Sequence, residues 1–112
     1  MKKSLFLLFV ICFLLSCDSK PKRTAPSVLL NEPQMIDVVT DVQIMEATIS
    51  YKKNVNQKTT YLKTFGYDTL FSHYGITDSI FKENMRYYYE IEPQAFVRIL
   101  DSVETRLSKM RN

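Results

Sequence analysis

Residues 93–110 read PQAFVRILDSVETRLSKM, and their pattern decides the fold class. Apolar side chains recur along this segment at helical spacing, and Pro93 stands where a proline suits the first helical turn. These side chains are Phe96, Ile99, Leu100, Val103, Leu107 and Met110. The spacing predicts an amphipathic helix that begins at Pro93 and buries one face against the rest of the domain.

The segment after Asn31 predicts another helix, the first in chain order. Asn31 can cap this helix, and Pro33 suits its first turn. Its predicted apolar side consists of Met35, Ile36, Val38, Val39, Val42, Met45 and Ile49. We expect the helix to end near Ser50 or Tyr51, where a polar loop over residues 52–59 begins.

Two more helices are predicted between these. One runs over residues 60–73, and Gly66 is a weak point at which it can divide into two shorter pieces. Its apolar side consists of Leu62, Phe65, Leu70, Phe71 and Tyr74. Gly75 suits the left-handed residue that ends a helix, and Thr77 can cap the next helix, over 78–90. With short connections between its helices, the chain predicts an all-α fold, a small bundle of about four helices in one domain.

The N-terminus has the pattern of an export signal. Lys2 and Lys3 precede an apolar run over residues 5–15, which as a helix is only about 16 Å long. The hydrocarbon core of a bilayer is roughly 30 Å thick, so we do not expect a permanent transmembrane helix. A positive start followed by a short apolar run is typical of a secretory signal.

Residues 14–17, LLSC, resemble the lipobox of bacterial lipoproteins. In that motif the cysteine, here Cys17, is acylated and becomes the mature N-terminus. The alternative is an ordinary signal peptide followed by a chance cysteine. Because Cys12 would be removed and Cys17 blocked, no thiol is left for a disulfide, a metal or catalysis. The predicted organisation has three parts: a signal peptide over 1–16, an acylated and flexible tether over 17–31, and a helical domain over 32–112.

The positive charge of the chain belongs to its N-terminal segment. Lys and Arg number 15 against 12 Asp and Glu, but from Glu32 onward 10 basic residues stand against 11 acidic ones. Nucleic-acid binding is therefore not expected, because it needs basic residues gathered on the folded part. Lys20, Lys22 and Arg23 lie beside the predicted anchor and can contact anionic headgroups, at about 1 kcal/mol each. The alternative is that they serve solubility alone.

No group of residues predicts catalysis. His73, the only histidine, falls in the last turn of a predicted helix, where it suits the helix dipole. Asp37 and Asp41 share a helix face, but a solvated face explains them better than an acid–base pair in so short a chain. The same holds for Glu90 and Glu92 at a helix boundary. We expect no metal, cofactor or enzymatic activity; a hydrolase using Asp37, Asp41 or His73 is a distant hypothesis.

Three consecutive tyrosines are the most unusual feature of the sequence. Successive helical residues lie about 100° apart, so the three side chains cannot all face one core. Tyr88 is predicted to pack with Phe81 and Met85. Tyr87 should lie at the edge of the core, and Tyr89 should point elsewhere. Because tyrosine is enriched at protein interfaces, Tyr89 is a candidate contact for a partner protein.

Two blocks of the sequence resemble one protein family. Residues 35–47, MIDVVTDVQIMEA, resemble the first helix of small lipoproteins from Bacteroidetes, the domain of unknown function 4296 family. Residues 71–77, FSHYGIT, and then Phe81, 85–88 (MRYY) and Pro93 resemble the second half of that family.

The resemblance covers about residues 32–107 and implies a small helical lipoprotein, without an activity, a ligand or a catalytic residue. Surface-exported lipoproteins of those bacteria have an acidic stretch after the cysteine. In this chain Asp18 is followed by the basic residues Lys20, Lys22 and Arg23. This departure favours an anchor that faces the periplasm.

The leading functional hypothesis is a membrane-anchored lipoprotein that serves as a non-catalytic binding or accessory module of an envelope protein complex. A core of about eighty ordered residues supplies only about 3–5 kcal/mol, so docking onto a partner would stabilise the domain. The alternative is a protein that binds a lipid or a small apolar ligand in the bundle interior. The adaptable side chains that would line such an interior are Met35, Met45, Met85 and Met110.

Overall fold

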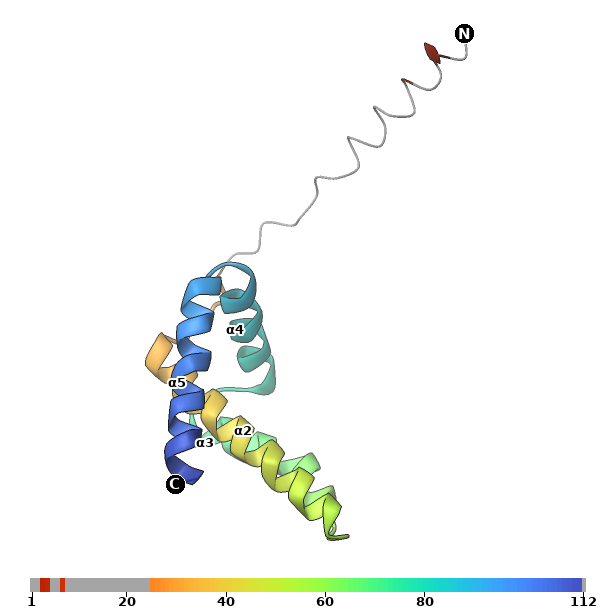
Figure 1. The fold of residues 1–112 in the computed structure, drawn as a ribbon, viewed down its shortest axis with the longest axis vertical. Coiled ribbons are helices and arrows are strands. Elements are labelled where there is room, and N and C mark those ends of the chain that lie inside the picture. The colour runs from red at the N-terminus through yellow and green to blue at the C-terminus, as the bar shows by residue number, and fades with distance from the viewer. Residues whose placement is uncertain (1–2, 5–6, 8–24, 112) are drawn as a thin grey trace.

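The computed structural model describes residues 3–4, 7 and 25–111. From residue 25 onward it consists of the helices α2 (Glu32–Asn54), α3 (Tyr67–His73), α4 (Asp78–Glu90) and α5 (Pro93–Arg111), and of the π-helical turn η1 (Leu62–Gly66) (Figure 1). The described residues contain no strand, so the predicted all-α bundle of about four helices is confirmed. None of the helices described is long and apolar enough to cross a membrane.

The predicted lipidation and headgroup sites lie outside the described residues. They are Cys17, Lys20, Lys22 and Arg23.

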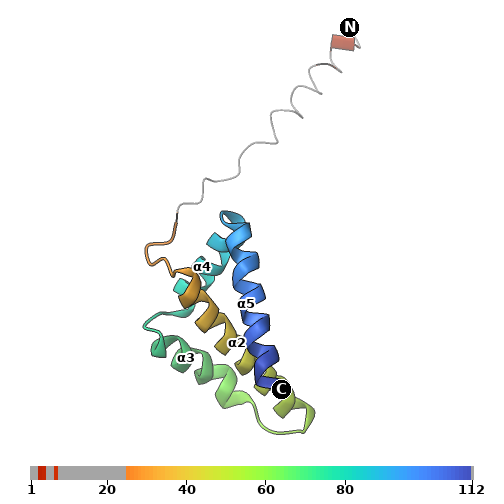
Figure 2. The same ribbon diagram turned by 60° about the vertical axis from the view of Figure 1, so that its left-hand side comes forward.

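Helix α2 is the longest of the described elements, and α5, η1 and α3 pack against it. Helix α5 packs along one side of α2, and η1 and α3 run back along another side. Helix α4 packs against α3 and α5, and a tight turn makes α4 and α5 antiparallel neighbours (Figure 2). The loop between α2 and η1 therefore lies at the opposite end of the molecule from residues 25–31.

A complete capping box begins α2. The Asn31 side chain accepts a hydrogen bond from the Gln34 N–H, and the Gln34 side chain accepts one from the Asn31 N–H, each at 2.9 Å. These reciprocal bonds satisfy two amides, one of them in the first helical turn, where no intrahelical partner exists. The predicted start of this helix is confirmed.

The predicted end of this helix, near Ser50 or Tyr51, is wrong. Helix α2 continues to Asn54, because the loop that follows satisfies the last helical carbonyls. The Gln57 N–H donates to the Lys52 carbonyl at 2.8 Å, and the Asn56 N–H donates to the next carbonyl at 3.2 Å. These bonds let the polar residues after Tyr51 remain helical.

The helix predicted over 60–73 is present, but the chain does not divide at Gly66 into two shorter helices. Instead of breaking at Gly66, residues 62–66 wind as the π-helical turn η1, which leads directly into α3. Phe65 was predicted on the apolar side, but it is 53% exposed. The wider turn of a π-helix rotates the following side chains away from the positions that an α-helix gives them.

The core lies between α2, α3, α4 and α5. Met35, Val38 and Ile99 are fully buried or nearly so. The buried residues around them are Leu30, Val39, Val42, Phe71, Ile76, Tyr88, Ala95 and Val103. Leu100 and Met110, predicted on the buried side of the last helix, are 41% and 63% exposed. The buried row of α5 instead follows Ala95, Ile99 and Val103, four residues apart, and Leu100 points about 100° away from it.

The last residues assigned to the tether are held against α4. Leu30 is 6% exposed, and its carbonyl accepts a hydrogen bond from the Tyr88 hydroxyl. Asn84, which is fully buried, binds the Leu30 N–H and the Val28 carbonyl, both at 2.8 Å. The packed part of the chain thus begins at least four residues before Glu32.

Candidate functional site

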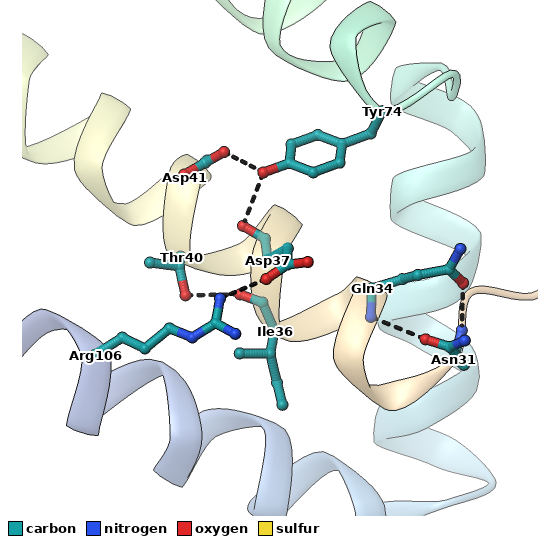
Figure 3. A network of polar contacts seen from close by, with 8 residues as sticks. All are labelled: Asn31, Gln34, Ile36, Asp37, Thr40, Asp41, Tyr74 and Arg106. Atoms are coloured by element: carbon teal, nitrogen blue, oxygen red, sulfur yellow. Dashed lines mark hydrogen bonds and ion pairs between the residues drawn. The ribbon is translucent and has the colours of Figure 1, made fainter.

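The two aspartates of α2 each hold a residue of another part of the bundle (Figure 3). Tyr74 directly follows α3. Its hydroxyl donates a hydrogen bond to the Asp41 carboxylate and lies 3.4 Å from the Asp37 carbonyl oxygen. Arg106 of α5 forms an ion pair with the Asp37 carboxylate. Asp37 and Asp41 therefore connect α2 to its neighbours on two sides, which a purely solvated face would not do.

Tyr74 is a hydrogen-bond donor over the whole ordinary pH range. Burial, the hydrogen bond to Asp41 and the nearby charges of Asp41 and Asp37 raise the pKa of Tyr74 to about 12, although Arg106 acts in the opposite direction. A phenol with so high a pKa keeps its proton, so it orients the Asp41 carboxylate and does not act as a base.

His73 is the last residue of α3, as the sequence predicted, and its ring lies edge-on to the Tyr74 ring, with centroids 5.1 Å apart. Glu90 ends α4 and Glu92 precedes α5, so the boundary predicted between them is confirmed. In the part of the chain that the structure describes, no three His, Cys, Asp or Glu side chains are placed to hold a metal ion.

Two open grooves flank the C-terminal half of α2. The first, of about 600 Å³, is formed by α2 with η1 and α3. The second, of about 580 Å³, is formed by α2 with α5. Ile44 and Thr48 line both grooves, and Ile44 is 38% exposed. The Ile44 side chain is therefore an apolar ridge between two hollows.

The first groove has apolar walls and a polar end. Met45, Leu62 and Leu70 supply apolar lining, while Tyr74 and Asp41 stand at the end where α3 finishes. Gly66 of η1 lies against the Met45 side chain of α2. A Cβ atom at Gly66 would lie only 3.1 Å from the Met45 sulfur.

The second groove is open and mainly apolar along its length. Tyr51 of α2 and Met110 of α5 line it and are 66% and 63% exposed. Leu107 is half-buried between them and the core. Glu104 and Arg111 also line this groove and are joined by a 3.3 Å ion pair on the surface. Because Tyr61, 72% exposed, lines the first groove, large apolar side chains face solvent on both sides of Ile44.

The three tyrosines point as predicted. Tyr88 is buried, Tyr87 is half-buried against the core, and Tyr89 is 69% exposed. The Tyr89 ring meets the Phe96 ring of α5 edge-on, at a centroid distance of 6.0 Å. Tyr89 thus belongs to the surface at the end of α4, whereas the two grooves lie along the far half of α2.

Comparison with protein families matches residues 26–112 to a family described as a domain of unknown function, DUF4296. The chain belongs to this family. The membership of the DUF4296 family predicted from the sequence is therefore confirmed, and the match includes the segment before α2 that Asn84 and Tyr88 hold. A search of curated proteins and a search of solved structures each found no match.

Sequence reasoning missed Ile44 in this DUF4296 domain. Ile44 lies outside the apolar side predicted for the first helix, so it was not assigned to the core. An isoleucine on the polar side of an amphipathic helix was the signal that could have identified it. The grooves themselves depend on how η1, α3 and α5 pack against α2, which no local pattern specifies.

Proposed function

We propose that this DUF4296 protein is a bacterial envelope lipoprotein whose helical domain is a non-catalytic binding module for a protein of an envelope complex. The binding role rests on one observation, the exposed Ile44 ridge between two apolar grooves. The anchor rests on the lipobox-like residues 14–17, with acylation of Cys17. The basic residues that follow Cys17 in the sequence, Lys20, Lys22 and Arg23, support an orientation toward the periplasm, and we propose that they contact anionic headgroups.

The surface around Ile44 is better suited to binding a protein segment than to catalysis. Protein interfaces bury aromatic and other large apolar side chains at their centres, and Ile44, Tyr51 and Met110 offer such area around one ridge. Asp37 and Asp41 already bind Arg106 and Tyr74, so the fold uses both carboxylates to join helices. The domain offers a shaped apolar surface, and a helix or extended segment with apolar anchors would fill it.

The test is crosslinking in cells, followed by capture of the tagged full chain from detergent-solubilised membranes and identification of partners by mass spectrometry. Ile44→Glu should lower the recovery of the partner at least about tenfold, because it buries a charge at the centre of the interface. Val97→Glu is the matched control, because Val97 is 56% exposed on α5 and lines neither groove.

A partner recovered in near-stoichiometric amount, lost with Ile44→Glu and kept with Val97→Glu, supports the proposal. Equal recovery with both variants would show that the grooves are not the binding surface. Cys17→Ser should move the protein out of the membrane fraction; if it does not, the anchor is wrong. Tyr89→Ala tests the second contact that we propose, which is dropped if every association survives this change.

A second candidate is the binding of a lipid or a small apolar ligand. The first groove favours it, because about 600 Å³ lined by Met45, Leu62 and Leu70 is a volume typical of ligand sites. The four methionines expected to line one interior are divided among different parts of the molecule. Met35 is fully buried in the core and Met85 packs against that core, whereas Met45 lines the first groove and Met110 the second. Native mass spectrometry of the full chain would detect such a ligand, and Leu70→Asp should remove it.

A further inference from the structure

The end of the molecule formed by the α2–η1 loop is positively charged. Residues 47–67 contain Lys52, Lys53, Lys58 and Lys63 and no acidic residue. The other residues from 25 to 111 carry six basic and eleven acidic side chains. The near-neutral domain is thus strongly polarised, with four positive charges at one end and a net negative charge over the remainder.

The ion pairs between described residues lie outside this end of the molecule. Across the described residues, the ion pairs found join Lys82 to Asp78, Arg98 to Glu32, Arg106 to Asp37 and Arg111 to Glu104. None of them involves a lysine of residues 47–67. Lys53, Lys58 and Lys63 are exposed, and Lys52 is half-buried.

Large apolar side chains stand among these lysines. Tyr61 is 72% exposed and Phe65 is 53% exposed, and their rings lie side by side with centroids 5.4 Å apart. Val55, in the loop itself, is 45% exposed. The π-helical turn η1 contributes to this arrangement, since it turns Phe65 out of the apolar side where an α-helix would place it.

The loop that presents these side chains is tightly hydrogen-bonded. Asn56 adopts a left-handed conformation, with φ of 58°, and the Gln57 N–H closes onto the Lys52 carbonyl at 2.8 Å. Thr59 is buried, and its carbonyl accepts a hydrogen bond from the Lys63 N–H at 3.0 Å. Residues 51–65, which we call the cationic tip, therefore form a defined surface.

We propose that the cationic tip binds the surface of an anionic phospholipid membrane. Lysine side chains extend their charged ends toward headgroups, while tyrosine and phenylalanine rings settle at the boundary between headgroups and acyl chains. The tip combines both features, with Lys58 and Lys63 beside the Tyr61–Phe65 pair in the sequence. Such a pairing of positive charge with exposed apolar area is typical of segments that lie on membranes.

This contact is distinct from the proposed acyl anchor. The tip lies at the far end of α2, away from residues 25–31 through which the chain enters the domain. It adjoins the proposed protein-binding surface, because Tyr61 lines the first groove and Tyr51 lines the second. The proposed membrane contact requires neither acylation of Cys17 nor a protein partner.

The test uses a tryptophan placed in the full chain, which has none of its own. Tyr61→Trp reports on the tip, and Tyr89→Trp is the matched control, because Tyr89 is similarly exposed, at 69%, at the end of α4. The chain is reconstituted into vesicles of phosphatidylcholine, with or without phosphatidylglycerol, that carry brominated acyl chains as quenchers. We expect Trp fluorescence from position 61 to be quenched and blue-shifted only in the anionic vesicles, and position 89 to be insensitive to lipid charge.

Lysine variants test whether charge is the cause. The double variant Lys58→Gln, Lys63→Gln should lower the ratio of membrane-bound to unbound tip, measured by the quenching at position 61, about 25-fold. This corresponds to about fivefold for each lysine. Lys82→Gln with Lys109→Gln removes the same charge from exposed positions outside the tip and should change little. Circular dichroism confirms that each variant retains its helices.

Three results would overturn the proposal: no quenching at position 61 in anionic vesicles, equal quenching in both kinds of vesicle, or equal effects of the two lysine pairs. A crosslinker at position 61 that captures an acidic protein in cells, without quenching in vesicles, would assign the tip to a protein and likewise overturn it.

Discussion

The side-chain oxygen of Asn84 accepts a hydrogen bond of 2.8 Å from the Leu30 N–H, which lies 54 residues earlier in the chain. The amide nitrogen of Asn84 donates to the Val28 and Ile80 carbonyls, also at 2.8 Å. Asn84 is completely buried, and these bonds satisfy its polar atoms. One side chain of α4 thus holds the segment that leads from the N-terminal part of the chain into α2.

Asn84→Ala should lower the free energy of unfolding by about 2–3 kcal/mol, because it leaves buried backbone groups of the N-terminal segment without partners. Urea unfolding followed by circular dichroism measures the change. Glu83→Ala, at the exposed neighbouring position, should stay within about 0.5 kcal/mol of the unchanged protein. Equal losses in the two variants would mean that the hydrogen bonds of Asn84 do not stabilise the fold.

Tyr74→Phe should change how stability depends on alkaline pH. Burial and the bond to Asp41 raise the pKa of Tyr74 from 10.0 to about 12 in the folded chain. Between these two values the folded state holds a proton that the unfolded state has lost, so stability falls as pH rises from 10 to 12. Below pH 10 the Tyr74 hydroxyl makes its full contribution to the stability of the fold. Thermal melts across this range should show a shallower decline for Tyr74→Phe, and an unchanged slope would contradict the assignment.

The local elements of the fold were predictable because each depends on neighbours in sequence. The Asn31 cap, the left-handed Gly75 with φ of 68° and the Thr77 cap all lie where the residue types predicted them. Each device acts within three or four residues, through one side chain or one backbone angle. The bounds of α4 therefore match the prediction at both ends.

The features that were missed depend on residues far apart in sequence. In the sequence Asn84 is an ordinary polar residue of a helix, and its role depends on Leu30, to which it is hydrogen-bonded. Ile44 forms a ridge because a groove lies on each side of it. The π-helical turn forms where Gly66 lets η1 approach Met45. Phe65 was consequently assigned to the wrong face. The spacing of apolar residues predicts the helices, whereas the packing of the helices determines which surface residues line a groove.

Asp37 and Arg106 should show a modest, salt-dependent coupling. Their side chains are both 47% exposed, so solvent screens the ion pair. A double-mutant cycle of Asp37→Asn and Arg106→Gln should give a coupling of about 0.2–1 kcal/mol that shrinks in high salt. Urea titrations at low and high salt measure it. A coupling that does not respond to salt would indicate that the contact stabilises α2 against α5 through packing.

The two glycines of the chain should respond to alanine in opposite directions. Gly75 has a φ of 68° and open space around it, so Gly75→Ala meets no neighbour and costs about 1 kcal/mol through the backbone alone. Gly66 has helical angles, φ −62° and ψ −44°, so alanine there gains up to about 1 kcal/mol of helix propensity. A new Cβ would lie 3.1 Å from the sulfur of Met45.

Because the methionine side chain is flexible, it can move by a few tenths of an ångström, and we expect Gly66→Ala to stabilise the fold by about 0.5 kcal/mol. Urea unfolding of the two alanine variants separates backbone strain from packing. Gly75→Asn is the control for strain, since asparagine tolerates the left-handed conformation and should cost less than alanine. If Gly66→Ala is as destabilising as Gly75→Ala, then Met45 is held rigidly in the first groove, and the wall of that groove is part of the packed core.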